Sequence, residues 1–240
     1  MNEERRQQMI KLASAAAFLA VVIVAVLIVI SQSQSGGGGD ASDVAGAAEI
    51  EDQLGGISQR GMVLGEPGAG VTLVEFGDLQ CPVCKGFAEE ILPPLIESQV
   101  RSGEAKIEFR NFTIIGQESV EAGAAAVAAG EQGRGWSFVE LFYRNQGREA
   151  SGYVTDEFLT AIAEGAGVPD IERWNRERRS EEAIGAVEES TAQAQRLGLS
   201  GTPSFAVEGP GVENPGAEGL EVIGTPQSTG ELEAAIEAAS

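Results

Sequence analysis

The sequence predicts an α/β domain with an all-helical insertion, preceded by one N-terminal transmembrane helix. Three observations indicate this arrangement. Residues 71–76 form a nearly continuous apolar run, which is typical of a strand in a sheet covered on both faces. Residues from about 117 to 197 place apolar and aromatic side chains at helical spacing. Residues 13–30 carry no charge and are long enough to approach the thickness of a bilayer.

Composition limits the classes of function. The chain has 240 residues, of which 42% are hydrophobic, so it can bury one good core. Its net charge is −21, with 37 acidic against 16 basic residues, which argues against nucleic acid as a partner. It contains no histidine, which removes Ser-His and Cys-His catalysis and the commonest metal ligand.

The N-terminal segment has the features of a membrane anchor. Residues 1–12 are polar and basic, and they predict a cytoplasmic N-terminus. The apolar run 13–30 exceeds the usual length of a signal-peptide core, and no clear cleavage site follows it directly. We therefore expect an uncleaved signal anchor rather than a cleaved signal peptide or a buried soluble helix. The protein would then be a single-pass protein of the cell membrane, with its C-terminal domain outside the cytoplasm.

Two further boundaries follow from composition. Residues 31–60 are rich in Gly, Ser and Gln and predict a flexible linker, with only a weak helix near 47–50. The folded domain is expected over 61–240. Within it, 106–110 and 220–223 are predicted strands, and the pattern Ser-Thr-Gly-Glu at 228–231 is a capping box that opens a final helix.

The only two cysteines, Cys81 and Cys84, form a C-x-x-C between the strand 71–76 and a predicted helix from 85 to about 100. The pair Pro93-Pro94 would kink or interrupt this helix. A strand, a turn and a C-x-x-C opening a helix indicate a redox site. The helix N-terminus stabilises a thiolate on the first cysteine, and the second lies one turn away, within bonding reach. We expect Cys81 to be exposed and Cys84 to be shielded.

Two other interpretations of the cysteine pair are less favourable. A zinc site needs about four ligands, and two cysteines without histidine fall short of the usual sets, so no metal site is predicted. A purely structural disulfide over so short a step would close almost no loop and would gain little stability.

Two residues outside the C-x-x-C are further candidates. Glu75 lies inside an apolar strand, and a buried carboxylate behind the C-x-x-C could take or give the proton of Cys84. The alternative is an exposed glutamate at the end of the strand. Pro203, preceded by Thr202, stands directly before a predicted strand, and cis peptide bonds occur essentially before proline. Taken alone, Pro203 would be an ordinary turn proline.

The segment Glu-Phe-Gly-Asp-Leu-Gln-Cys-Pro-Val-Cys at 75–84 resembles the active-site segment of the DsbA-like, thioredoxin-fold proteins of bacterial envelopes. The resemblance covers roughly 61–240 and continues, in the family's order, at 109–112, 133–142 and 201–205. It implies a thioredoxin-like fold of four or five strands, with the helical insertion covering the site and shaping a substrate groove. Pro82 and Val83 complete the motif, although Val83 stands where the family often has an aromatic residue or a histidine.

The resemblance also implies functions for individual residues. A cis-proline loop formed by Thr202 and Pro203 would face the C-x-x-C and hold the backbone of a substrate, and Glu75 would occupy the position of the family's buried acid. Cys81 would be the attacking or attacked sulfur, and Cys84 would resolve the mixed disulfide.

The expected function is thiol–disulfide exchange on exported proteins with cysteines, most simply by donating a disulfide, together with an envelope or membrane redox partner and without a cofactor. A reductase or isomerase fed by a membrane electron donor is one alternative. A membrane-anchored binding module that has kept the fold without turnover is the other.

Overall fold

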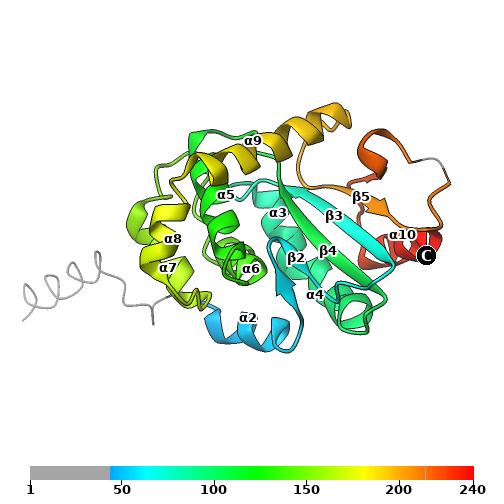
Figure 1. Ribbon diagram of the computed structural model, residues 1–240, viewed down its shortest axis with the longest axis horizontal. Helices are drawn as coiled ribbons and strands as arrows, with labels where there is room; N and C mark the ends of the chain where they lie inside the picture. The colour runs from blue at the N-terminus through cyan, green and yellow to red at the C-terminus, as the bar shows by residue number, and fades with distance from the viewer. Residues whose placement is uncertain (1–43, 214) are drawn as a thin grey trace, which may run out of the picture. The chain divides into compact units, whose positions relative to one another are not determined.

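The computed structural model describes residues 44–213 and 215–240. Their centre is a six-stranded sheet in the order β1-β2-β4-β3-β5-β6 (Figure 1). The strands are β1 (Gln59–Arg60), β2 (Val63–Leu64), β3 (Val71–Gly77), β4 (Ala105–Asn111), β5 (Ser204–Glu208) and β6 (Glu221–Gly224). The predicted strands at 71–76, 106–110 and 220–223 all appear within one residue of these bounds. The sheet has six strands where the sequence predicts four or five. β1 and β2 have only two residues each, which is too short to show an alternating pattern.

β3 lies at the middle of the sheet and positions the C-x-x-C. It runs parallel to β4 and antiparallel to β5, with Glu75 opposite Phe109 on one side and Phe205 on the other. All seven residues of β3 are buried, including Glu75. Helices cover both faces of the sheet, so the strand has no solvent side and the apolar run in its sequence follows directly.

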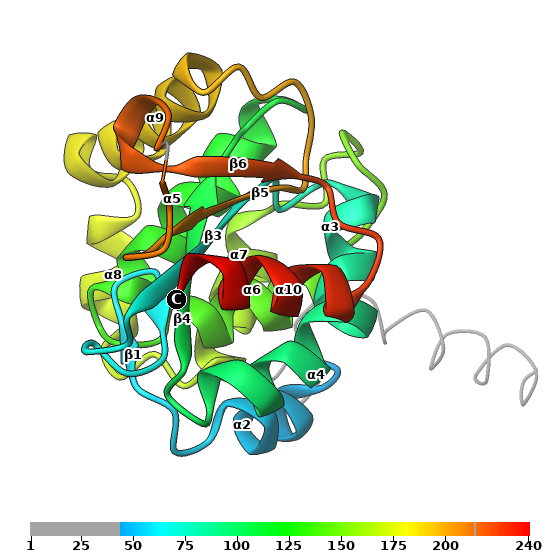
Figure 2. The same ribbon diagram turned by 90° about the vertical axis from the view of Figure 1, so that its right-hand side faces the viewer.

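The helices lie before β1, between β3 and β4, between β4 and β5, and after β5. Their bounds are α2 (Ala47–Leu54), α3 (Pro82–Gly86), η2 (Phe87–Ile91), α4 (Leu92–Leu95), η3 (Ile96–Val100), α5 (Gln117–Gly130), α6 (Gly135–Arg144), α7 (Asp156–Gly165), α8 (Ile171–Glu177), α9 (Glu181–Arg196), η4 (Ala217–Gly219) and α10 (Thr229–Ala239). One face of the sheet packs on α3 to η3, α6 and α10, and the other packs on the end of α9. Figure 2 shows α10 crossing the sheet beside β5.

The helix that follows the C-x-x-C continues from Pro82 to Val100 without a break. Pro82 occupies its first turn, where a missing N–H is tolerated. Pro93 and Pro94 occupy the first turn of α4, between the π-helical turns η2 and η3. The chain therefore stays helical through the two prolines, and their effect is a departure from regular α-helix into π turns on either side.

The segment between β4 and β5 is helical, with α5 to α9 beside the sheet (Figure 1). Its interior is a group of aromatic rings whose neighbouring centroids are 5.2 to 6.3 Å apart, formed by Phe138, Phe142, Tyr153, Phe158 and Trp174. Phe109 of β4 packs on α6 from the sheet, because its ring meets those of Trp136 and Tyr143 edge to face. The two parts share one continuous core.

The structure differs from the expected linker over 31–60 and from a domain that begins at 61. Helix α2 forms at 47–54, and its Ile50 and Leu54 are buried in the main core against α6. Asn145 fixes the chain just before α2, since its side chain bonds both the N–H and the carbonyl of Ala45 at 3.0 and 2.9 Å. The weak helix predicted near 47–50 thus forms and extends to 54, and its two buried apolar residues lie one turn apart on the face that meets the core.

No helix in the described part of the chain is long and apolar enough to cross a membrane. The cytoplasmic N-terminus predicted at 1–12, the transmembrane anchor predicted at 13–30 and the first part of the predicted linker lie outside the described residues.

Candidate active site

The turn at 77–80 carries the first cysteine on a rigid support. A Cβ atom on Gly77 would lie 2.5 Å from the ring of Phe109, so only glycine fits there. The buried carboxylate of Asp78 accepts hydrogen bonds from the backbone N–H groups of Gln80, Ile114 and Ile115 at 2.9, 2.9 and 3.1 Å. This side chain therefore ties the turn to the segment that follows β4.

Cys81 is the N-cap of α3, and its sulfur accepts a hydrogen bond from the N–H of Cys84 at 3.5 Å. The pKa of Cys81 is lowered from 9.0 to about 6, mainly by hydrogen bonding from the thiol of Cys84 and against the opposing effect of burial. The Thr202 side chain and the N–H groups of Cys84 and Val83 contribute to the same lowering. Cys81 is therefore mainly a thiolate at neutral pH, as expected of a sulfur at a helix N-terminus.

Cys84 has the opposite character. It is completely buried, and burial together with its hydrogen bond to Cys81 raises its pKa well above 9.0. Cys81 is itself only 7% exposed, so the expected exposed sulfur is in fact a recessed one. Both cysteines are free thiols in this structure. The pair thus holds one reactive sulfur and one sulfur that keeps its proton.

The loop before β5 lies against Cys81, although it is more than a hundred residues away along the chain. The peptide bond between Thr202 and Pro203 is cis. As a thiol, Cys81 donates to the carbonyl oxygen of Thr202 at 3.5 Å. The hydroxyl of Thr225 holds the loop from behind by donating to the carbonyl of Pro203 at 2.7 Å. The structure therefore brings Thr202 and Pro203 to the cysteines.

Glu75 lies on the strand before the turn and is 1% exposed. Neither of its carboxylate oxygens has a hydrogen-bond partner among the residues that the structure describes. Burial raises its pKa from 4.5 to about 8, and the negative charge of Cys81 adds to the effect. The alternative of an exposed glutamate at the strand end does not fit this position, whereas a carboxyl group that holds a proton near neutral pH does.

Pro82 and Val83 form the exposed part of the motif. Pro82 is the first residue of α3, and Val83 is 55% exposed beside the recessed sulfur. Val83 is one of three large hydrophobic side chains that are exposed in the described part of the chain, with Ile114 and Val222. An apolar side chain therefore borders the approach to Cys81.

Several supporting residues are not evident from the sequence. The amide of Gln146, two residues after α6, donates to the carbonyls of Leu79 and Cys81 at 2.7 and 3.1 Å, so it holds the backbone on either side of Gln80. Gln80 bonds Ser119 of α5 at 3.0 Å. Asp78 and Gln80 lie inside the segment that carries the family resemblance, so the resemblance could have marked them as supporting residues. No signal in the sequence indicates Gln146.

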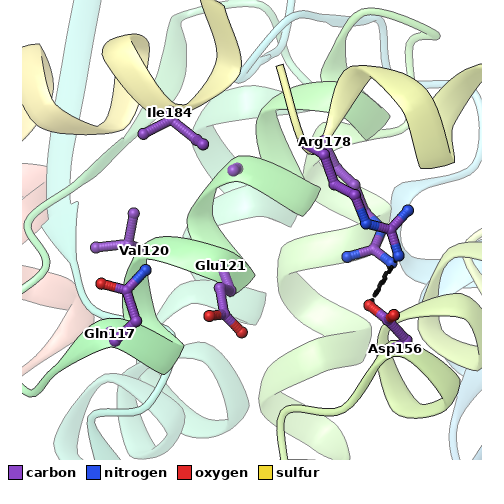
Figure 3. Close-up of a pocket in the computed structure, with 8 residues that line it drawn as sticks. Gln117, Val120, Glu121, Asp156, Arg178 and Ile184 are labelled. Atoms are coloured by element: carbon purple, nitrogen blue, oxygen red, sulfur yellow. Dashed lines mark hydrogen bonds and ion pairs between the residues drawn. The ribbon is translucent and has the colours of Figure 1, made fainter. Parts of the chain in front are cut away.

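A hollow of about 350 Å³ lies within the helical insertion and not at the cysteines (Figure 3). An ion pair between Arg178 and Asp156, 2.6 Å apart, closes one side of it, and Val120 and Ile184 line the other. Within the described ranges, no group of three or more His, Cys, Asp or Glu side chains is placed to hold a metal ion.

Comparison with known proteins agrees with this geometry. A family model described as thioredoxin matches residues 58–237. A probable disulfide bond formation protein D from Bacillus anthracis is 33% identical over 162 residues, covering 66% of this chain and 74% of that protein. The chain belongs to the DsbA-like thioredoxin family. As a member of this family it is a protein thiol–disulfide oxidoreductase.

Solved structures of the family superpose on the chain. BdbD from Bacillus subtilis, in its oxidised form, aligns with a TM-score of 0.63 at 26% identity, over 75% of this chain and 96% of that one. A thioredoxin-like oxidoreductase from Silicibacter pomeroyi aligns with a TM-score of 0.57 at 30% identity, over 74% and 90% of the two chains. The thioredoxin-like α/β fold with added helices is thereby confirmed.

Proposed function

We propose that this DsbA-like protein donates its Cys81–Cys84 disulfide to exported proteins. The observation that supports this direction is the pKa of Cys81, lowered to about 6 beside a partner whose pKa is raised. A stabilised thiolate favours the reduced form of the pair, so the oxidised form gives up its disulfide readily. DsbA, with a pKa near 3.5, and thioredoxin, with one near 7, bracket this value. We therefore expect an oxidant of intermediate strength.

The reaction has two displacements. A substrate thiolate attacks Cys81, forms a bond between the two sulfurs, and breaks the Cys81–Cys84 bond. Cys84 leaves with the electron pair and takes a proton, which we assign to the carboxyl group of Glu75. A second substrate thiolate then attacks the substrate sulfur of the mixed disulfide. Cys81 leaves as a thiolate, the substrate gains a disulfide, and the protein is reduced by two electrons.

The surroundings of Cys81 suit a peptide substrate. We expect the backbone beside Pro203 to pair with an extended peptide, a form of recognition that gives affinity without demanding one sequence. The exposed side chain of Val83 offers an apolar contact next to the reacting sulfur. We infer that the substrates are unfolded, cysteine-containing chains.

The setting of the reaction is proposed from the sequence. The uncharged run at 13–30 behind a basic segment would anchor the chain in the membrane, with the oxidoreductase domain outside the cytoplasm. A membrane or envelope redox partner would reoxidise the cysteines after each cycle.

The direction of transfer is tested by the reduction potential of the Cys81–Cys84 pair, measured by equilibration with glutathione. We expect a value between about −120 mV, as in DsbA, and about −230 mV, as in glutaredoxins. A potential near or below the roughly −270 mV of thioredoxin would overturn the oxidase assignment and favour the reductase.

The division of labour between the sulfurs is tested by trapping. In Cys84→Ser no internal disulfide can form, but the Cys81 thiolate can attack the disulfide of an oxidised substrate, which is the reverse of the proposed reaction. No second protein thiol can then resolve the mixed disulfide, so substrates should remain on Cys81 as adducts that reducing agents release. In Cys81→Ser the remaining sulfur is fully buried and should trap little. Equal trapping by the two variants would contradict this assignment of the two sulfurs, and trapping by neither would support the binding-module alternative.

A further inference from the structure

A second buried carboxyl group lies in the core near Glu75. Glu140 of α6 is 4% exposed, and its Oε1 has no hydrogen-bond partner among the described residues. Burying a carboxylate oxygen without a hydrogen-bond partner is costly. The two displacements of the exchange reaction make no use of Glu140.

The geometry of α6 turns Glu140 toward the sheet. Trp136, Glu140 and Tyr143 are spaced four and three residues apart, so they share one face of the helix. The two aromatic residues both contact Phe109, which lies directly opposite Glu75 in the β3–β4 ladder. Glu75 and Glu140 therefore lie on the same side of the sheet, in the same apolar core.

The charged surroundings of Glu140 come from few elements. Burial raises its pKa from 4.5 to about 8, and the negative charges of Glu75 on β3 and Glu89 on η2 act in the same direction, while Arg144 at the end of α6 opposes them. The buried residues of α2 and α7, which also pack on α6, are all apolar, and those of α5 carry no ionisable group. Behind Glu75 lie Cys81, Cys84 and the neutral phenol of Tyr143.

We propose that Glu140 is a positioning residue of the exchange reaction, which acts through Glu75 and sets the pH range over which Glu75 can exchange a proton with Cys84. This inference rests on the proposed role of Glu75. Two carboxyl groups that repel each other in a low-dielectric core lose their protons in two separate steps that belong to the pair. When Glu75 gives its proton to Cys84, the remaining proton on Glu140 limits the negative charge that the core must hold.

The test compares the full chain with Glu140→Gln, which keeps the size and shape of the side chain. Carbon-13 labelling of the glutamate carboxyl groups and NMR titration give the ionisation of Glu75 directly, with its signal assigned by its loss in Glu75→Gln. We expect Glu75 to titrate in Glu140→Gln at a pH lower by roughly half to one unit, because the repulsion is gone. The pH profile for reoxidation of reduced Cys81 and Cys84 by glutathione disulfide should move by the same amount.

Two further variants separate this effect from a change in stability. Glu164→Gln removes an exposed carboxylate from α7 and should leave both the titration and the profile in place. Arg144→Gln removes the nearby positive charge and should move the titration of Glu140 to higher pH.

The outcomes distinguish the inference from the function on which it rests. An unmoved Glu75 titration in Glu140→Gln, or a moved titration with an unchanged pH profile, would overturn the role assigned to Glu140. A wild-type protein that does not exchange with glutathione at any pH would overturn the proposed function. Any coupling between the two carboxyl groups seen by NMR would then be a structural property alone, and the role of Glu140 in exchange would be overturned together with the proposed function.

Discussion

Cys81 and Cys84 are three residues apart, yet their surroundings move the pKa values of their thiols in opposite directions. Cys81 receives hydrogen bonds at a helix N-terminus, whereas Cys84, one turn further, is enclosed by the core. The spacing in the sequence predicts this asymmetry, since only the first position has free N–H groups beside it. The contribution of Thr202 depends on contact across the fold.

That contribution can be measured. Replacing Thr202 with Val removes a hydroxyl that lowers the pKa of Cys81 and keeps the size of the side chain. Thiolate absorbance of the reduced wild type should titrate with a midpoint near 6, and that of Thr202→Val at a higher pH. Thr160→Val, which loses a hydroxyl bound to the backbone of α7, is the matched control and should match the wild type. A midpoint unchanged in Thr202→Val would show that its hydroxyl does not act on the sulfur.

Glu75 gives the domain a dependence of stability on pH. Its pKa is raised from 4.5 to about 8 on folding. The free energy of unfolding is therefore highest below pH 4.5, and it falls as the pH rises from 4.5 through 8. Glu75→Gln lacks this loss. Its free energy of unfolding relative to wild type should increase with pH over this window, by at most about 1.4 kcal/mol for each pH unit. Urea unfolding at pH 5 and pH 8 measures it, and an equal difference at both values would contradict the raised pKa.

Among the elements, α2 shows where composition misleads. The stretch around it contains glycines and charges typical of a linker, and only Ile50 and Leu54 bury apolar surface. Those two side chains meet a core that other elements have already built, which a window of local sequence cannot show. The continuous helix from Pro82 to Val100 is a similar case, because π turns are set by packing and leave no pattern.

The integration of α2 into the domain predicts a stability difference within one helix. Leu54→Ala removes a side chain that is 2% exposed, and it should lower the free energy of unfolding by about 2–5 kcal/mol. Asp52→Ala, on the exposed side of the same helix, should change it by less than about 0.5 kcal/mol. Both values follow from urea unfolding of the full chain. Equal effects of the two substitutions would mean that α2 is not part of the cooperative unit.

For the molecule as a whole, the sequence predicts more of the architecture than of the site. The strands, the C-x-x-C helix and the helical insertion follow from periodicity, and the family resemblance joins them into a thioredoxin-like fold. Glu75, Cys84 and Thr202 are candidates from the sequence alone, and their roles stay predictions. Glu140 and Gln146 are not, because the first is an ordinary polar residue of a helix and the second an ordinary polar residue just after it, until the sheet and α6 are packed together.

The predicted membrane topology has its own test. A phosphatase reporter that is active only outside the cytoplasm, fused after Ser240, should be active in cells, and the mature chain should keep residues 1–30. A reporter fused to a chain that lacks residues 13–30 is the control and should stay inactive. Mass spectrometry that finds a new N-terminus between residues 31 and 48 would show a cleaved signal peptide instead.

The contact between Cys81 and Thr202 also orders events during synthesis. The two residues are 121 positions apart, and β5, which pairs with β3 beside the cysteines, follows Thr202 in the chain. A ribosome releases both cysteines, the first long helix and the whole insertion before it reaches this loop. Pairings this distant along a chain form late in folding. The incomplete chain therefore has both thiols but lacks the hydroxyl that helps to ionise Cys81, so the full reactivity of the sulfur belongs only to the finished protein.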